Sequence, residues 1–458
     1  MGIGSRDLVI DKTFKFKKRI DELRSKEYYS EDPGKLINLF EKVIVNTSEI
    51  INKTDEEDEK GIRRINILLS FYHLLLDEIE HIEVNNVPVE MLPIFTKILD
   101  KLQVKTVFVF RPNPLYNYSY YPVTKAINAI NKSQHYPEVE EDYKISVISF
   151  PSSEKNSALL HCSFSHEVGH HLNEVLSIAN DLEPQIIPLI DKQLLKKYTD
   201  KYLESLKKER RIISGTEVSL DKFFMEDQLT SELTELFGGI IRKWLDEIVS
   251  DSIALCLFGP AFVFAISEFL LASQDPKKYS ESHPPMFIRL KNLMNLFDEK
   301  GFSEHLKNHK DVIAKLESYK KISEMTFEPN ISNLEDVRNI ILERGIVQLF
   351  KPARDRIDSK IDFAKQFAWN LDDLDDAVFA FRNLITGNEV LVLKDQTSRP
   401  INAITILNAA WIVRINYIDE LYKMLSKTER TQVRDILDEL TLKSLDLQEF
   451  HSRMVSKK

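Results

Sequence analysis

The segment SFSHEVGHHLNEVL (163–176) contains the residues best suited to chemistry in this chain. His166 and His170 are four positions apart, so on a helix both rings project from one face and can bind one metal ion. Glu167 is rotated by one residue, which places its carboxylate beside such an ion without making it a ligand. This H-E-x-x-H arrangement suits zinc binding and the removal of a proton from a zinc-activated water. Gly169 would let another element approach this helix closely.

A third ligand must come from elsewhere, because the segment lacks the further Gly and His of the metzincin pattern. The segment KWLDEIVSDSIALCLFGP (243–260) offers Glu247 and Asp251, which share a helix face with apolar residues. Two carboxylates on such a face are costly to bury unless they are paired or bind a metal. We therefore expect Glu247 to complete a His2Glu site with an open fourth position. Asp251 is expected to accept a hydrogen bond from a ligand histidine.

Three alternatives compete with this assignment. The histidine segment could be a surface turn, and the 243–260 carboxylates could form an exposed acidic helix face. Glu174 is a poorer third ligand than Glu247, because it lies one turn beyond His170 and would have to reach back. Asp246 points about 100° away from Glu247 on a helix, and we expect it to be solvated.

These motifs resemble those of the gluzincin zinc peptidases. The matching residues are HEVGH (166–170), the later E-I-V-S-D (247–251), and S-H-P-P (282–285) followed by Arg289. Among gluzincins, the chain is most similar to the group containing the CAAX prenyl-protein endopeptidases, the membrane heat-shock proteases and their soluble minimal relatives. The resemblance covers about 144–295, one third of the chain.

The resemblance implies a set of site residues. Zinc would be bound by His166, His170 and Glu247, and Glu167 would be the catalytic base. Asp251 would lie behind the ligands, and His283 and Arg289 would lie near the active site.

The expected reaction is hydrolysis of a peptide bond. Glu167 takes a proton from the zinc-activated water and passes it to the leaving amine. Either His283 or a tyrosine of 116–121 would help zinc to hold the oxyanion. Tyr118 and Tyr120 are the candidate substrate contacts. Alternatively, His283 is satisfied locally near a helix start, and the tyrosines only pack their loop.

The hydrophobic pattern predicts a mainly α protein with a small β-sheet (α+β). Only 105–110 and 144–150 have the β-branched and aromatic character of strands, and a Tyr-rich loop separates them. The second strand could pair with an extended peptide by edge addition. Apolar residues at helical spacing fill 8–103, for example between Ile65 and Ile79.

Helices are expected on both sides of the histidines. One helix should run over about 155–176 and carry them, and a charged, exposed helical excursion should follow near 182–222. A long helix is predicted over about 224–258, with a possible break at Gly238-Gly239. Pro284-Pro285 should begin another helix.

Three regions follow from this pattern. A zincin-like metallopeptidase core is expected at 104–300, with an N-terminal helical region at 1–103 and a C-terminal one at 301–458. The helical regions would enclose the cleft or recognise a protein partner. The oligomeric state is not predicted.

Composition limits the classes of function. The chain has 62 Lys and Arg against 72 Asp and Glu, a net charge of −10, so we expect no nucleic-acid partner. Cys162 and Cys256 are the only cysteines, too few for a disulfide framework or a cysteine-only zinc site, which favours the cytoplasm. The most apolar stretch, 253–266, is too short to span a membrane, and the first residues lack the apolar run of a signal peptide.

The leading hypothesis is therefore a zinc metalloendopeptidase that acts on a peptide or protein. A second hypothesis is a non-catalytic binding or regulatory protein that zinc stabilises. Glu167 favours the enzyme, because a purely structural zinc site does not need that carboxylate. A third hypothesis is a protease that acts as a toxin, defence or signalling effector and needs a trigger. The motifs do not bear on this hypothesis.

Overall fold

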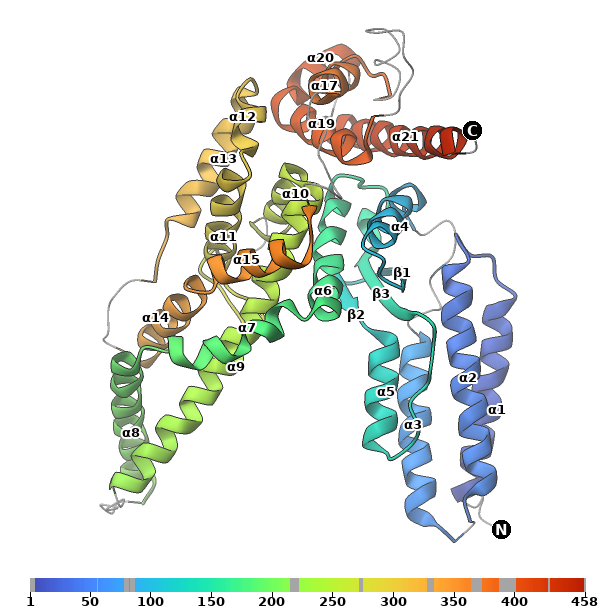
Figure 1. Ribbon diagram of the computed structural model, residues 1–458, viewed down its shortest axis with the longest axis vertical. Coiled ribbons are helices and arrows are strands. Elements are labelled where there is room, and N and C mark those ends of the chain that lie inside the picture. Colours follow the sequence, from blue (N-terminus) through green and yellow to red (C-terminus); the bar gives the residue numbers. More distant parts are fainter. Residues whose placement is uncertain are drawn as a thin grey trace. The chain divides into compact units, whose positions relative to one another are not determined.

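The computed structural model describes residues 5–55, 57–77, 82, 87–214, 222–271, 275–327, 333–363, 373–386, 401–426 and 429–456. These residues are mainly helical and include one small sheet, which confirms the predicted fold class. Figure 1 labels their helices and strands. The chain divides into two compact units, Met1–Ala158 (unit 1) and Leu159–Lys458 (unit 2).

Unit 1 combines helices with the sheet. Its elements are α1 (Ser5–Arg24), α2 (Asp32–Lys53), α3 (Glu59–Asp77), η2 (Val89–Met91), α4 (Leu92–Lys101), β1 (Thr106–Asn113), β2 (Ser119–Tyr121), α5 (Val123–Ser133), β3 (Lys144–Pro151) and η3 (Ser152–Glu154). The helical spacing predicted for α3 is confirmed, because the side chains that follow it are all buried: Ile65, Leu68, Leu69, Tyr72, Leu75 and Leu76. Ile79 lies outside the described residues.

The sheet has the strand order β1-β3-β2. β1 runs parallel to β3, and β2 pairs antiparallel with it through 119–121 and 147–149. The sequence did not predict β2, because a three-residue strand is too short to show a periodicity and is defined by its pairing. β3 is the central strand, with both sides paired over 147–149, so the prediction of edge addition to it is wrong.

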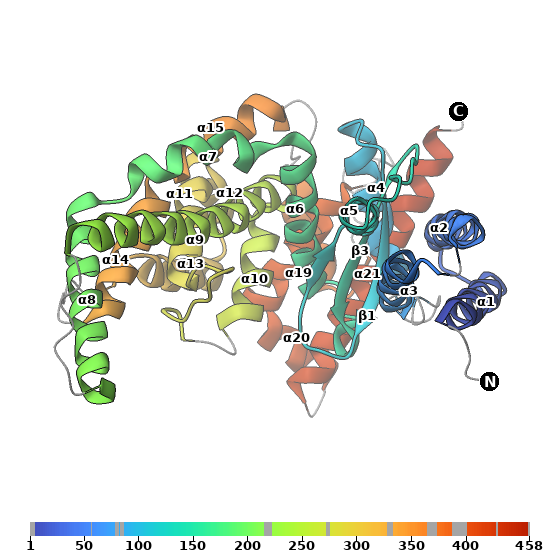
Figure 2. The same cartoon turned by 90° about the horizontal axis from the view of Figure 1, so that it is seen from below.

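Helices of unit 1 pack against this sheet. α2 contacts β1 and α5 contacts β3 (Figure 2). α2 starts with Pro33 in its first turn and buries Leu36, Phe40 and Val43, which recur at helical spacing. These side chains belong to one apolar cluster with Val147 of β3. The repeat that makes α2 amphipathic therefore also fixes its position on the sheet.

Unit 2 is almost entirely helical. Its elements are η4 (Leu160–Ser163), α6 (Phe164–Leu176), α7 (Ile178–Leu189), α8 (Lys192–Ser214), α9 (Lys222–Phe258), α10 (Pro260–Leu271), α11 (Met286–Glu299), α12 (Phe302–Leu306), α13 (Lys310–Ser323), α14 (Leu334–Val347), α15 (Phe350–Lys360), α17 (Leu374–Arg382), α19 (Ala403–Asn416), α20 (Ile418–Leu425) and α21 (Arg430–Ser456). The start of α11 confirms the helix predicted after Pro284-Pro285.

The long helix α9 organises unit 2. It contacts α6, α7, α8, α10, α11, α14 and α15. The predicted break at Gly238-Gly239 is wrong, because α9 continues through both residues. A Cβ on Gly238 would lie 2.6 Å from Cδ1 of Ile187 in α7, so this glycine serves a close helix contact. Packing by the large buried side chains of Phe237 and Trp244 offsets its weak helix propensity.

The helix that carries the histidines starts later than predicted. Residues 155–163 form turns and η4, and α6 begins at Phe164. Side chains distant in sequence hold this stretch, since Asp438 accepts a hydrogen bond from the Leu159 backbone N–H at 3.1 Å. The Trp411 indole N–H donates to the Leu159 carbonyl at 3.2 Å. These bonds satisfy backbone groups that a longer helix would otherwise pair.

The charged excursion predicted near 182–222 corresponds to α7 and α8, although 215–221 lie outside the described residues. The prediction that this segment is exposed is wrong in part, because α7 packs on α9 and α8 packs on α14. Leu182, Ile186 and Leu194 are buried in these contacts. An amphipathic helix can be rich in charge and still bury one apolar stripe.

The two compact units differ from the three predicted regions. Unit 1 contains the three strands between 106 and 151 together with the N-terminal helices, and its strands β1 and β3 pack on α2 and α5 respectively. The predicted C-terminal region joins unit 2, where α14 and α15 contact α9, and α19 contacts α10.

The apolar stretch at 253–266 is buried, as predicted, and is divided between α9 and α10. Among the helices that the structure describes, none combines the length and the apolar character that a membrane crossing requires.

Candidate metal centre

Helices α6 and α9 approach each other closely at Gly169. A Cβ on Gly169 would lie 2.5 Å from the carbonyl oxygen of Ser250 and 2.9 Å from its Cα. Because such a contact would be with backbone, any larger residue at 169 would push the helices apart. The expected role of this glycine is confirmed, and it brings the histidine motif of α6 next to the carboxylates of α9.

His166, His170 and Glu247 form a group that could hold one metal ion. One ligand atom from each residue lies within 4.8 Å of the others. The Nε2 atoms of the two histidines are 3.1 Å apart, and each lies 3.3 Å from one oxygen of Glu247. The group does not include Glu174. The structure thus brings together the three predicted ligands from two helices.

The chemistry of this group fits a zinc ion. Two imidazole nitrogens and one carboxylate oxygen are ligands that zinc prefers, and three protein ligands leave a fourth position for water. The buried Oε2 atom of Glu247 lies 3.3 Å from His166 Nε2 and 3.6 Å from Arg289 Nη1, but among the described residues it has no hydrogen bond of good geometry, so a bound cation would satisfy it. Burial raises the pKa of Glu247, but His170 and His166 lower it well below the ordinary value. The carboxylate is therefore ionised and available as a ligand.

Asp251 lies behind His166, as predicted. Its Oδ1 atom is 2.9 Å from His166 Nδ1, so Nε2 of the ring faces Glu247. In the metal-free site, burial opposes protonation of His166, but Asp251 and then Glu247 raise its pKa to about 10. A metal ion must displace this proton.

Arg289 of α11 is buried and holds Asp251 in place. Its Nε donates to Oδ2 at 2.8 Å, and its Nη2 donates to Oδ1 at 2.6 Å. The guanidinium also lies 3.6 Å from Glu247 Oε2. Burial raises the pKa of Asp251, but the charge of Arg289 and the hydrogen bonds from Arg289 and His166 together lower it below the ordinary value. Arg289 therefore lies near the site, where its charge is balanced by the carboxylates of Asp251 and Glu247.

Two polar residues behind His170 were missed by the sequence analysis. His170 Nδ1 lies 3.0 Å from Ser250 Oγ. Asn173 donates to the Asp246 carboxylate at 3.0 Å and accepts from the Ala179 N–H at 2.8 Å, which links α6, α9 and α7. Asp246 is therefore half-buried and paired, and the prediction that it is solvated is wrong. Ser250 lies three residues after Glu247, a spacing that indicates the same helix face.

The Glu167 carboxylate lies in a buried position beside the metal group. No hydrogen bond or ion pair to it is found among the described residues, and the residue is 6% exposed. Burial raises its pKa, while the charges of His166 and His170 act in the opposite direction. A carboxylate with a raised pKa and no fixed partner has the properties expected of a general base.

His283 lies at the exposed rim of the same group. Its Nε2 is 3.6 Å from Glu247 Oε1, and its side chain is 60% exposed. Nδ1 lies 2.8 Å from Ser282 Oγ, which agrees with the local interaction considered above. The Trp244 indole N–H donates to the Ser280 carbonyl at 3.0 Å, and this hydrogen bond anchors the segment that carries His283. Partial burial lowers the pKa of His283, which favours the neutral ring.

Tyr118 and Tyr120 lie in unit 1, whereas the metal group lies in unit 2. Tyr118 is buried, and the Tyr120 hydroxyl is 3.3 Å from Ser146 Oγ of β3. Both observations agree with a packing role in unit 1. Their role as substrate contacts stays a prediction.

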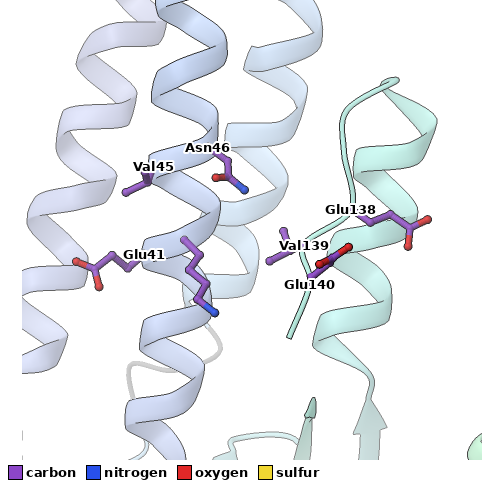
Figure 3. Close-up of a pocket in the computed structure, with 7 residues that line it drawn as sticks. Glu41, Val45, Asn46, Glu138, Val139 and Glu140 are labelled. Atoms are coloured by element: carbon purple, nitrogen blue, oxygen red, sulfur yellow. The ribbon is translucent and has the colours of Figure 1, made fainter. Parts of the chain in front are cut away.

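A separate groove of about 510 Å³ lies in unit 1 between α2 and the residues that precede β3 (Figure 3). It is lined by Glu41, Lys42, Val45, Asn46, Glu138, Val139 and Glu140. Two of the lining charges are already paired, Glu41 with Arg24 at 2.6 Å and Lys42 with Glu141 at 2.8 Å. The groove contains none of the predicted site residues.

Comparisons of the chain with protein-family models, with curated proteins and with solved structures found no match. The case for a function therefore rests on the residues of the metal group and on their geometry.

Proposed function

We propose that this protein is a zinc-dependent metalloendopeptidase. The observation that carries the proposal is the convergence of His166, His170 and Glu247, whose ligand atoms lie within 4.8 Å of one another. Their helices are distant in sequence, with His170 and Glu247 separated by 247 − 170 = 77 residues. The buried carboxylate of Glu167 beside this group has no hydrogen-bond or ion-pair partner in the part of the chain that the structure describes, which favours catalysis over a purely structural site.

Each residue of the site has a defined part in the proposed reaction. His166, His170 and Glu247 would hold the zinc ion, and Asp251 would orient the His166 ring. When bound, zinc supplies a Lewis acid that lowers the pKa of a water and polarises a carbonyl group. Glu167 would take the proton from the attacking water and deliver it to the leaving amine.

His283 is the candidate donor to the oxyanion. Its Nε2 points to the rim of the group, and contact of Nδ1 with the Ser282 hydroxyl restrains the ring. A neutral imidazole with a proton on Nε2 could donate a hydrogen bond to the charge that develops on the substrate oxygen. The proposed substrate is a peptide or a protein. Both cysteines are buried and unpaired, which agrees with the proposed cytoplasmic location.

The substitution Glu167→Gln tests the proposal. It removes the base but keeps the shape of the side chain and all three ligands, so zinc should remain bound while hydrolysis of a mixed peptide library falls by at least about 10²-fold. Glu174→Gln is the matched control, because it makes the same change on the same helix outside the metal group. Equal hydrolysis by wild type and Glu167→Gln would refute the assigned base.

One observation favours the second candidate, a non-catalytic protein that zinc stabilises. With its Nε2 only 3.6 Å from Glu247, His283 could supply a fourth side-chain ligand and close the site. Such a protein would bind zinc tightly and would hydrolyse no peptide. Zinc analysis combined with the peptide assay separates the two candidates.

A further inference from the structure

We infer that Ser250 is a positioning residue that fixes His170 in the tautomer required for metal binding. This inference rests on the proposed zinc site and assigns a role to a residue that the sequence motif does not specify. His170 directs Nε2 toward Glu247 and His166, at 3.3 and 3.1 Å, and Nδ1 toward Ser250 Oγ at 3.0 Å. A histidine that binds a metal through Nε2 carries its proton on Nδ1.

The hydroxyl of Ser250 has only one proton to donate. That proton is directed to the carbonyl oxygen of Asp246, at 2.8 Å in the preceding turn of α9. The lone pairs of Oγ are then free to accept, so Nδ1 of His170 is the donor and its Nε2 lone pair faces the metal group. Every polar atom of this contact is satisfied in the tautomer that binds metal.

The close approach of α6 and α9 keeps this contact in register. The Ser250 backbone lies against Gly169, where a Cβ would come within 2.5 Å of the Ser250 carbonyl. His170 follows Gly169 directly, so the backbone that carries the imidazole and the backbone that carries the hydroxyl touch. Ser250 is completely buried, so its hydroxyl has no access to water as an alternative partner.

The two ligand histidines thus have different partners. His166 faces the carboxylate of Asp251, which is held by Arg289, whereas His170 faces a neutral hydroxyl. A carboxylate makes an imidazole a stronger ligand than a hydroxyl does. His170 also has the more exposed side chain, at 22% against 7% for His166. We therefore expect the metal bond to His170 to depend on Ser250 and to be the weaker of the two.

The test compares Ser250→Ala with Ser252→Ala in the full-length protein. Ser252 is equally buried on the same helix, but its hydroxyl donates to the Ile248 carbonyl and accepts from Asn292 at 2.8 Å. Each variant loses one buried hydroxyl. Zinc affinity, measured by competition with a chelating dye, should fall about tenfold for Ser250→Ala and stay within about twofold for Ser252→Ala.

A second readout does not require metal. In metal-free protein with ¹⁵N-labelled histidine, at a pH where the ring is neutral, His170 should carry its proton on Nδ1 in wild type and in Ser252→Ala. Ser250→Ala should show a mixture of both tautomers, with the signal assigned by its absence from His170→Gln. Equal zinc affinity and an unchanged tautomer in Ser250→Ala would overturn the role assigned to Ser250 but would leave the proposed function standing. Failure of wild type to bind zinc would overturn the proposed function as well.

Discussion

Arg289 donates two hydrogen bonds to Asp251, and both side chains are buried. The same guanidinium lies 3.6 Å from Glu247. One cation on α11 therefore balances two carboxylates on α9, one of which is a proposed zinc ligand. A buried charge network of this kind contributes to function by holding ligands in place, while the loss of one member leaves the others unpaired.

The substitution Arg289→Met should destabilise the metal-free protein by about 3–5 kcal/mol, because two buried carboxylates lose their counter-charge. Zinc should recover part of this loss by neutralising Glu247. Urea unfolding with and without zinc measures both effects. Arg356→Met is the control, since its partner Asp181 is partly exposed and such a pair contributes at most about 1 kcal/mol. Equal losses in the two variants would contradict the assigned role of Arg289.

The close contact of Gly169 with Ser250 is expected to set the distance between α6 and α9. Gly169→Ala should force α6 away from α9, lower the free energy of unfolding by about 1–3 kcal/mol and weaken zinc binding. Gly239→Ala is the matched control, because no described residue outside the local helix backbone comes within 4 Å of the Cβ position there. It should stabilise α9 by up to about 1 kcal/mol through higher helix propensity. Unchanged zinc affinity in Gly169→Ala would show that the close approach is not required.

His283→Gln separates the two candidate functions. If His283 donates to the oxyanion, kcat should fall by about 10²-fold while zinc affinity stays unchanged. If His283 is a fourth ligand, zinc affinity should fall and wild type should hydrolyse no peptide. His305→Gln, the same change at an exposed histidine of α12, controls for the loss of an imidazole. Steady-state kinetics and zinc titration together give the answer.

The stability of the metal-free protein should depend on pH through His166. Its pKa is about 10 in the folded, metal-free site and about 6.5 in an unfolded chain. Because folding raises this pKa, the stabilisation from the protonated ring is complete below pH about 6.5 and is lost as the pH rises to about 10. Zinc replaces the proton, so the loaded protein should not show this loss.

Melting temperatures measured across this range, with chelator and with one equivalent of zinc, test the prediction. The difference between the two forms should grow with pH, and zinc binding at pH 7 should release a proton, detectable by calorimetry in buffers of different ionisation enthalpy. Metal-free His166→Gln should lack this part of the pH dependence. A constant difference between loaded and metal-free wild type would exclude displacement of a His166 proton.

The sequence predicted those features that depend on spacing within one element. A separation of four residues on a helix places His166 with His170, and Glu247 with Asp251, on single faces. The buried stripe of α3 and the start of α11 at Met286, directly after Pro284-Pro285, follow from the same local rules. Gly169 could be recognised because a glycine inside a helix has little use except to admit a neighbour.

The tertiary structure decided which faces meet and which polar atoms complete the site. Ser250 and Asn173 gain partners 80 and 73 residues away, and no local pattern encodes such a pair. The start of α6 depends on Trp411 and Asp438, and β2 exists only through its pairing with β3. Local sequence fixes the direction of side chains on an element, whereas packing free energy summed over the whole unit fixes the distance between elements.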